Sequence, residues 1–531
     1  MSEGAPAPPP RPSGLERPWL AVALLALLLL ASGGWIGLIE PTETRYAEIA
    51  REMLASGDWL TPRLDGIHHF HKPPVAYWAA ASGMALLGVN AWGARLFGLL
   101  ADVLTLALAA WIAARRFAAL RIHGGRAAWA LGSMLLFAVL ARGVATDPFL
   151  TAAVTLYWAL APGSLALVAL GLGFLTKGPV VFLHTALPVL VAALWARDRR
   201  YLALLGPPRG WIAFALVALP WYLMVVARTP GLLAYFLGNQ VVARVATETH
   251  GRGGPPWYFL VVLLAGTAPW TMAIIVGLAR TWRERVDPEA RLLICWLLAP
   301  TIFLSFSGSK LPSYLLPCMP AAALLAARGL DSGLARWGAL VMLGGLALYG
   351  GGELLEAASW THRATPALAF DACAVLLLGG MLAARGRPAP AALAAALAIA
   401  MLGCALAPYE TELGSPRQVA LQLARVRHGE PVVEIGHFNA GVPFYLKERV
   451  RLVEVPREKG FEDPRSLAGV VASPESLRAW VARDGRIWAF GPAGHVREVC
   501  ARAGLGLSPV ARWRDETLGF LRAASESAQA R

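Results

Sequence analysis

The chain carries the charged segment Glu40-Pro-Thr-Glu-Thr-Arg-Tyr-Ala-Glu-Ile-Ala-Arg-Glu-Met-Leu-Ala-Ser-Gly-Asp-Trp-Leu-Thr-Pro-Arg63 directly after its first long apolar run. Apolar residues recur at helical spacing from Tyr46 to Leu54, which predicts a short amphipathic helix that ends at Gly57. Thr42 and Glu43 lie at the N-terminal side of this helix, where the helix dipole favours anionic ligands.

A second polar group follows, His68-His69-Phe70-His71-Lys72-Pro73-Pro74. Proline disfavours helix in the residue before it, so we expect Lys72 in an extended segment. Imidazoles, an ammonium group and the carboxylates of the preceding helix would then gather at one surface of a bilayer. This combination predicts a site for a lipid phosphate.

Apolar runs set the fold class. Of the 531 residues, 57% are hydrophobic and 15% are charged. Uncharged runs such as Trp19–Leu30 and Leu165–Leu175 belong to apolar segments that approach the ~20 residues of a spanning helix. The alternating segments of about ten residues that build a membrane β-barrel are missing. We therefore predict an all-α polytopic membrane protein.

The net charge of +14 comes mostly from arginines in short loops between apolar segments. The positive-inside rule accounts for such loops better than nucleic-acid binding does, so we expect membrane lipids and no nucleic acid as partners. The five cysteines show no spacing of a disulfide framework or a zinc ribbon.

About thirteen apolar segments are candidate membrane spans. They are 18–39, 92–114, 127–143, 148–161, 164–176, 178–196, 210–228, 257–279, 291–306, 313–328, 336–352, 367–384 and 390–407. A cleaved signal peptide ending near Gly33 is an alternative to the first span, but the apolar run continues to Ile39 and favours a retained helix.

The basic loops orient these spans. If residues 1–17 are a disordered cytoplasmic N-terminus and 75–89 does not span, every strongly basic short loop falls on the cytoplasmic side. The residues in these loops are Arg115, Arg116, Arg121, Arg126, Arg197, Arg199, Arg200, Arg280, Arg283, Arg285, Arg291, Arg328, Arg336, Arg385 and Arg387. If 75–89 spanned, most of them would invert. Residues 40–91 are then the first periplasmic loop of a bacterial inner-membrane protein.

Loops with unusual polar residues converge on the periplasmic side. They are 40–91, Ala145–Asp147, Thr176–Pro179, 229–256 and Ser307–Pro312. Polar groups at membrane depth are costly and tend to be functional, so this face is expected to hold an active site. After a transmembrane domain over 18–407, alternating strand-like and helix-like runs predict a small periplasmic α/β domain over 408–531.

Asp147 is the leading single candidate in the transmembrane part. An aspartate before Pro148 is also a good helix cap. We interpret it as a site residue, because a capping serine or asparagine would cost less desolvation.

Lys72, Lys177 and Lys310 each lie beside an apolar span and within two residues of proline or glycine, in a chain where arginine dominates. Lysines that reach from a span to the interface are the ordinary explanation. Three of them on one face favour phosphate binding.

The imidazoles could hold a metal. His68, His69, His71 and His250 are candidates, with His71 and His250 the preferred ligands of a divalent ion, although surface histidines are the simpler explanation. We expect no cofactor to be required.

Several motifs together resemble the aminoarabinose transferase family, which belongs with the protein O-mannosyltransferases to the GT-C glycosyltransferases. The resemblance begins with Glu40-Pro-x-Glu43-Thr-Arg45-Tyr46 and Phe70-x-Lys72-Pro-Pro. It continues through Asp147, Leu175-Thr-Lys177-Gly-Pro179, Leu219-Pro-Trp-Tyr222, Pro256-Trp-Tyr258, Pro269-Trp270 and Ser309-Lys310-Leu-Pro312-x-Tyr314. These motifs cover most of residues 18–325 in order, and Val442-Pro-Phe-Tyr445-Leu extends the resemblance into the tail.

The resemblance implies a GT-C fold and an inverting transfer of a sugar from undecaprenyl phosphate to lipid A or another envelope glycan. It implies that Lys72, Arg252 and Lys310 hold the donor phosphate, to which we add Lys177, Arg45 and Tyr314. Glu43, Asp147 and Thr42 would line the reaction centre.

Two residues depart from the family pattern. Where the family has Pro-Asp-Glu, this chain has Pro41-Thr42-Glu43, and where it has Phe-Glu-Lys-Pro, this chain has Phe70-His71-Lys72-Pro73. A hydroxyl acceptor needs a general base, and threonine cannot be one at neutral pH. An ionised phosphate acceptor needs none, so Thr42 fits a phosphate acceptor better unless Glu43 or Asp147 has taken over.

Two other functions stay open. A transporter or flippase of lipid-linked substrates would be expected to show internal repeats and paired broken helices, and the sequence shows neither. A catalytically impaired relative acting as a scaffold is compatible with Thr42, because fold alone does not fix function.

Overall fold

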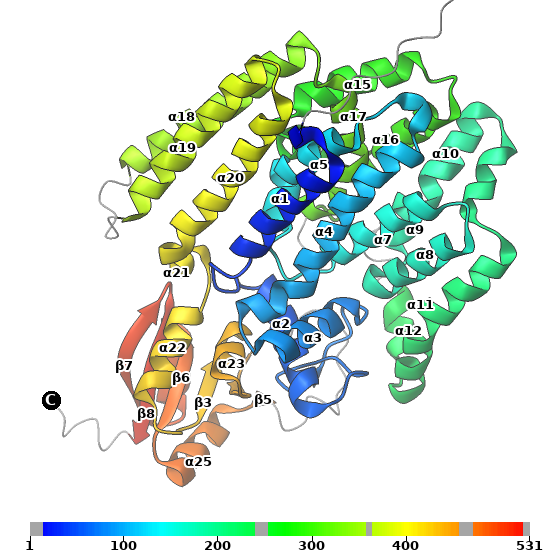
Figure 1. Ribbon diagram of the computed structural model, residues 1–531. Helices are drawn as coiled ribbons and strands as arrows, with labels where there is room; N and C mark the ends of the chain where they lie inside the picture. The colour runs from blue at the N-terminus through cyan, green and yellow to red at the C-terminus, as the bar shows by residue number, and fades with distance from the viewer. Residues whose placement is uncertain (1–13, 239–252, 357–363, 456–470, 524–531) are drawn as a thin grey trace, which may run out of the picture.

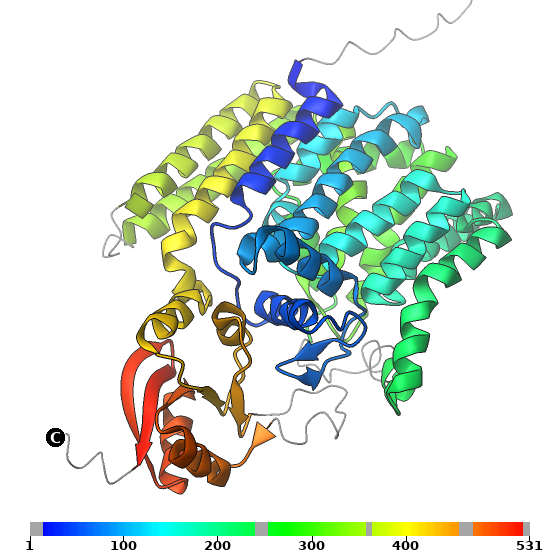
Figure 2. The same cartoon turned by 60° about the horizontal axis from the view of Figure 1, so that its bottom comes forward.

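The computed structural model describes residues 14–238, 253–356, 364–455 and 471–523. Figure 1 shows a large helical body with two smaller parts at one end, the first loop (α2, α3) and a C-terminal α/β domain. Helix α1 begins at the opposite end of the body, as the turned view in Figure 2 also shows. The first loop and the C-terminal domain therefore lie side by side at the same end.

The helical body follows the predicted apolar segments. Its helices are α1 (Pro18–Ser32), α4 (Ala91–Arg115), α5 (Gly124–Ser133), α6 (Leu135–Leu140), α7 (Asp147–Leu160), α8 (Ser164–Lys177), α9 (Val180–His184), α10 (Ala186–Ala196), α11 (Pro208–Arg228), α12 (Leu232–Tyr235), α14 (Tyr258–Gly266), α15 (Thr271–Arg283), α16 (Pro288–Ser305), the 3-10 helix η5 (Pro312–Cys318), α17 (Met319–Gly329), α18 (Gly333–Glu356), α19 (Ala364–Ala384) and α20 (Pro388–Leu406).

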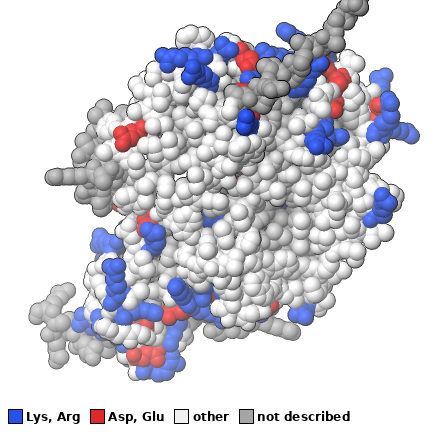
Figure 3. Space-filling view, viewed as in Figure 1, with Lys and Arg blue, Asp and Glu red and all other residues white. Residues whose placement is uncertain are grey.

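Six helices among the described residues are long and apolar enough to cross a membrane, or up to seven if a bent pair counts as one span. Four shorter apolar helices accompany them. The figure of thirteen spans stays a prediction, although each predicted segment contains helix. In Figure 3 most charged residues lie at the two ends and leave a broad, mostly uncharged face between them. The chain is a multi-pass membrane protein.

The predicted span 257–279 contains two helices, α14 and α15, in place of one. The chain bends by 108° between α14 and α15. Pro269 cannot donate a backbone hydrogen bond there, and the Thr267 hydroxyl bonds the Leu263 carbonyl within the turn. The segment 127–143 is likewise divided, and the Leu135 N–H at the start of α6 donates to the Ala268 carbonyl at 3.0 Å. This hydrogen bond therefore satisfies one backbone group at each of the two helix breaks.

The first loop folds around α2 (Thr42–Ser56), the predicted amphipathic helix, which ends at Gly57 with φ +70°. A two-strand ribbon, β1 (Arg63–Leu64) and β2 (Ile67–His68), leads to α3 (Val75–Leu87). Tyr46 and Tyr77 pack with ring centroids 5.2 Å apart. The ambiguous segment 75–89 therefore forms a helix that packs on α2 and covers its apolar face.

The C-terminal domain is an α/β sandwich, as the alternating runs predict. Its elements are α21 (Glu410–Leu413), α22 (Arg417–Val426), β3 (Val432–Ile435), α23 (Gly441–Leu446), β4 (Arg451–Val453), β5 (Val471–Ala472), α25 (Pro474–Asp484), β6 (Ile487–Pro492), α26 (Ala493–Arg502), β7 (Leu505–Trp513) and β8 (Glu516–Ala523). The sheet order is β5-β4-β3-β6-β8-β7. Strands β5, β4, β3 and β6 pair in parallel, and β8 pairs antiparallel with both β6 and β7.

Helices cover both faces of this sheet. Leu477 and Val496 of α25 and α26 pack on one face with Val433. Val419 and Val442 of α22 and α23 lie in the core on the other face. Helix α23, which the strand and helix pattern does not predict, packs against the first loop, and so does the chain that leads from it into β4.

Candidate active site

Glu43 forms a rigid unit with Arg95 of α4. Its Oε2 accepts from Arg95 Nη2 at 2.7 Å and from the Ile39 N–H at 3.0 Å. Its Oε1 accepts from Arg95 Nε at 3.0 Å and from the Val144 N–H at 2.8 Å. Both carboxylate oxygens are therefore occupied, which suits a residue that fixes the backbone better than one that takes up a proton.

Asp147 lies close to this unit along the chain. It is the first residue of α7, and its Oδ1 pairs with Lys177 Nζ at 2.7 Å. Both side chains are largely buried, with 12% and 9% exposed. Because α8 ends at Lys177, its ammonium group also compensates the negative end of that helix dipole.

Tyr314 and the serines of the loop after α16 continue the group. Lys177 Nζ lies 5.0 Å from the centre of the Tyr314 ring, within the range of a cation–π contact. The Tyr314 hydroxyl is 3.5 Å from Ser309 Oγ. Lys310 Nζ donates to the carbonyls of Gly254 and Ser307, both at 2.9 Å. Asp147, Lys177, Tyr314 and Lys310 thus form one polar group at one end of the helical body.

A cavity of about 430 Å³ opens next to this polar group. Lys177, Ser309 and Tyr314 line one part of it. The remaining wall is mainly apolar and comes from α7, α9, α10 and α16, with Leu150, Leu183, Leu187, Leu190 and Phe303 among its residues. We call this cavity the apolar slot. A slot that combines the Asp147-paired Lys177 with a mainly hydrocarbon wall suits an amphiphile with a polar head.

The first loop adds a second cationic group. His69 is buried, and its ring centroid lies 4.1 Å from that of His71. Burial lowers the pKa of His69 well below its usual value, and the nearby His71, Arg45 and Lys72 lower it further. His69 is therefore neutral at pH 7 and surrounded by positive charge.

This cationic group lies beside the end of α8. Phe70 packs in one core with Leu175 of α8 and Trp221 of α11. Leu175 and Lys177 both lie in the last turn of α8, so the loop that carries Lys72 packs against the end of the helix that carries Lys177.

The remaining predicted residues are Thr42, Arg45, Arg252 and His250. Thr42 is exposed at the first position of α2, next to Glu43. Arg252 and His250 lie outside the described residues. Arg45 is half-buried on α2, and its charge acts on His69.

The candidate metal ligand His71 has one imidazole neighbour, His69. Within the described ranges, His, Cys, Asp and Glu form no group of three that could hold a metal ion. Arg45 and Lys72 act on this site electrostatically, and positive neighbours favour an anion over a cation.

Sequence reasoning missed Arg95. It is 5% exposed in a helix that is otherwise almost free of charge, and it also donates to the carbonyls of Gly33, Ile36 and Gly37. A lone arginine inside a candidate span was the signal, because ionisable groups at membrane depth tend to have partners and a purpose.

Comparisons with known proteins agree on one family. A family model described as dolichyl-phosphate-mannose-protein mannosyltransferase matches residues 19–236. A protein of Pseudomonas paraeruginosa called undecaprenyl phosphate-alpha-4-amino-4-deoxy-L-arabinose arabinosyl transferase is 35% identical over 399 residues, which are 69% of each chain. Proteins described by the same activity from Pseudomonas fluorescens and Pectobacterium carotovorum are 36% and 35% identical over 58% and 68% of this chain, and the alignments span 57% and 64% of those relatives.

The crystal structure of ArnT from Cupriavidus metallidurans bound to undecaprenyl phosphate superimposes with a TM-score of 0.80 and 26% identity, over 96% of this chain and 98% of that one. The fold is therefore the GT-C fold with a small C-terminal sheet domain. The polar group, the apolar slot and these matches lead to one assignment: the chain belongs to the family of undecaprenyl phosphate-4-amino-4-deoxy-L-arabinose arabinosyl transferases.

Proposed function

We propose that the protein is an inverting glycosyltransferase that moves 4-amino-4-deoxy-L-arabinose from undecaprenyl phosphate to lipid A or another envelope glycan. The names of its relatives and the undecaprenyl phosphate in the similar crystal structure support the substrate class. The single observation that carries the proposal is the apolar slot, because Lys177 and Tyr314 line it together with a mainly hydrocarbon wall.

The slot suits the first isoprene units of the donor, with the phosphate at the part that Lys177 and Tyr314 line. Lys72, Lys177, Lys310, Arg45 and Arg252 are our candidates for its neutralisation. A lysine acts on a phosphate as a point charge, and several of them together stabilise the charge that grows on a leaving phosphate. Tyr314 contacts Lys177 through its ring.

The reaction is an in-line displacement at the anomeric carbon. An acceptor oxygen forms the new bond as the bond from that carbon to the donor phosphate oxygen breaks, and the electron pair leaves with undecaprenyl phosphate. Asp147 would face the sugar and stabilise its positive charge in the transition state, as carboxylates do in glycosyl transfer generally. A phosphate acceptor brings its own negative oxygen, so the exposed Thr42 needs no replacement as a base.

The site is proposed to lie on the periplasmic side of the bacterial inner membrane, with the N-terminus in the cytoplasm. The distribution of arginine supports this orientation, because Arg115 at the end of α4 and the other basic loops avoid the end that carries the first loop. The C-terminal domain would then be periplasmic.

We propose that transfer needs no metal, because the candidate cations of the chain already balance the donor phosphate. Turnover that survives treatment with EDTA supports this proposal. Loss with EDTA and recovery with zinc would contradict it.

The proposed function is tested with purified protein, radiolabelled undecaprenyl phosphate-aminoarabinose and lipid A in detergent. Transfer of label to lipid A is the expected result. In proteoliposomes, movement of the labelled donor across the bilayer without transfer would instead identify a flippase. If the protein neither transfers the sugar nor moves the donor, the remaining interpretation is a scaffold, which is compatible with Thr42.

A further inference from the structure

Helix α23 of the C-terminal domain is hydrogen-bonded to the segment that leads into α2. The Leu38 N–H donates to the Tyr445 hydroxyl at 2.7 Å. The Gly441 N–H donates to Glu40 Oε1 at 2.7 Å. One short helix therefore holds the segment Gly37–Glu40 at two points, 407 positions away in sequence in the first case.

The same helix completes the hydrophobic core of the first loop. Phe444 is fully buried in one core with Ile49 of α2, Tyr77 of α3 and Val144. In this core α23 packs like an element of the first loop itself. Since Val144 belongs to the same core, α23 also supports the chain that leads to Asp147.

Neighbouring side chains crowd Gly441 and Gly37, so that neither position has room for a Cβ unless a neighbour shifts. A Cβ on Gly441 would lie 2.2 Å from Pro416 Cγ and 2.9 Å from Thr44 Cγ2. A Cβ on Gly37 would lie 2.3 Å from Ser415 Oγ and 3.0 Å from the Tyr445 hydroxyl. The contact between the segment and the domain therefore leaves no room for a larger residue at either glycine.

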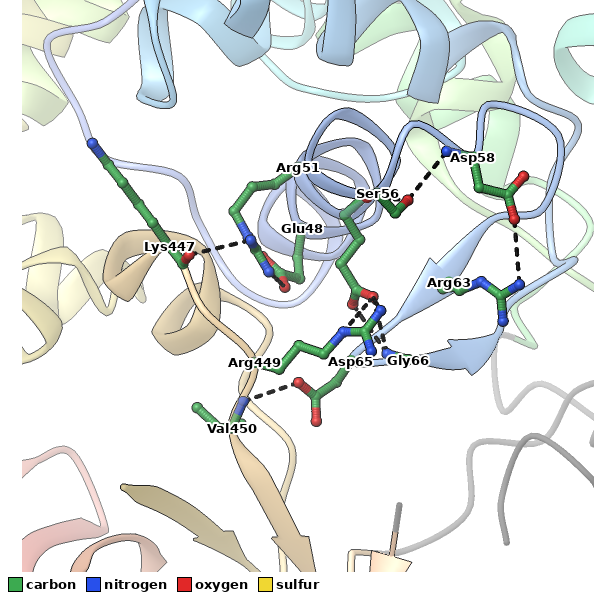
Figure 4. Close-up of polar contacts among 11 residues, drawn as sticks. Glu48, Arg51, Ser56, Asp58, Arg63, Asp65, Gly66, Lys447, Arg449 and Val450 are labelled. Carbon is green, nitrogen blue, oxygen red and sulfur yellow. Dashed lines mark hydrogen bonds and ion pairs between the residues drawn. The ribbon is translucent and has the colours of Figure 1, made fainter. Parts of the chain in front are cut away.

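Further bonds around α23 fix its orientation. Arg51 Nη1 donates to the Lys447 carbonyl at 3.3 Å, and the Val450 N–H donates to Asp65 Oδ1 at 3.0 Å. Figure 4 shows both contacts on the side of α2 that faces the domain. Glu410 Oε2 of α21 also accepts from the Gly37 N–H at 2.8 Å, on the same side of the segment as the Tyr445 hydroxyl.

The hydrogen-bonded segment is joined directly to the reaction centre. Arg95 donates to the Gly37 carbonyl, and the Ile39 N–H donates to Glu43. Glu43 in turn accepts from the Val144 N–H, three residues before Asp147. A displacement of Leu38 would therefore be transmitted to Asp147 through two hydrogen-bonded steps.

We propose that Tyr445 is a positioning residue for the transfer and that α23 holds the Glu43 and Asp147 backbones in their reactive arrangement. The inference rests on the proposed function. The inference gives the C-terminal domain the task of positioning the residues of the reaction centre, besides any role in covering the site.

The test compares Tyr445→Phe and Gly441→Ala with the wild-type protein and with Tyr157→Phe. The last is a matched control, because the Tyr157 hydroxyl also bonds a backbone group, the Leu204 carbonyl at 2.8 Å, but lies far along α7 from Asp147. Steady-state transfer and hydrogen–deuterium exchange of peptides covering 33–41 and 141–147 are measured for all four proteins.

We expect turnover to fall on the order of tenfold in both α23 variants, since small misplacements at a reaction centre cost large factors. The KM for donor should stay within about twofold of wild type, because neither residue contacts the slot, and both peptides should exchange faster. Tyr157→Phe should change neither quantity.

Wild-type turnover in Tyr445→Phe, or faster exchange without slower transfer, would overturn the inference. So would an equal loss in Tyr157→Phe. A wild-type protein that transfers no sugar would contradict the proposed function instead, and the exchange data would still show whether α23 holds the two segments.

Discussion

Asp147 and Lys177 form a largely buried ion pair between the first residue of α7 and the last residue of α8, and Lys177 lines the slot. Removing one charge of such a pair leaves the other uncompensated, which costs far more than the pair itself contributes. At the scale of single residues, our proposal assigns the chemistry to this pair and to the cations of the first loop.

We expect Asp147→Asn and Lys72→Ala each to reduce transfer at least about a hundredfold, the usual cost of one preorganised electrostatic group. Both proteins should still reach the membrane in normal amounts. Labelled-sugar transfer measures the effect, with Glu284→Gln as control. Glu284 pairs with Arg328 in a partly exposed bridge, and such bridges contribute little. Full activity in both site variants would remove this site assignment.

Thr42 poses a separate question because it stands where the family has aspartate. Thr42→Asp should preserve or raise transfer to lipid A, since an acid at a helix N-terminus is favourable and the position is exposed. Thr42→Asn is the uncharged control for size. Complete loss of transfer in Thr42→Asp would mean that the threonine has its own task in this chain.

At the scale of elements, the slot between α7, α9, α10 and α16 is the proposed binding site of the donor lipid. Leu187 lies on its wall. Leu187→Trp fills part of a cavity of about 430 Å³ and should raise the KM for undecaprenyl phosphate-aminoarabinose several-fold, because overpacking a fixed cavity costs about 1–3 kcal/mol.

A donor with a short prenyl chain distinguishes this effect from general damage. Its KM should change much less in Leu187→Trp, since it occupies less of the slot. Equal KM changes for both donors would contradict the assignment of the slot to the lipid.

The elements also show what sequence could and could not predict. Helix α2 and the long apolar helices follow from local periodicity and hydrophobicity, which the residues carry themselves. The bend between α14 and α15 follows only in part, because Pro269 marks a local break but the bond from the Leu135 N–H to the Ala268 carbonyl forms only in the fold. Lys177 and Tyr314 were readable as candidates, but the slot that they share is formed by four helices, and no single segment encodes it.

At the scale of the whole molecule, the junction between the first loop and the C-terminal domain contains buried acids. Burial raises the pKa of Asp65 to about 7, with Glu52 adding to the shift and Val450, Arg449 and Arg51 opposing it. Burial also raises the pKa of Glu434 well above its usual value. The sequence gives no hint of this, because Asp65 and Val450 are brought together only by the fold.

The junction should therefore lose stability as pH rises. The unfolded Asp65 ionises near pH 4 and the folded one near pH 7, so the folded state binds more protons between these values and its stability falls across that window. We expect the melting temperature to fall from pH 5 to pH 8. Asp65→Asn keeps an acceptor for the Val450 N–H and cannot ionise, so its decline should be smaller by about 2 °C or more. Equal declines would contradict this account.

The bond between Leu38 and Tyr445 has a consequence for biosynthesis. A ribosome makes the first loop early, but Phe444, which completes its core, emerges only after the last apolar helix. Until then the nascent protein holds an unfinished catalytic end, and no sugar should be transferred by chains that stop short of the C-terminal domain. Translation of the C-terminal domain would thus be required before the protein can transfer sugar.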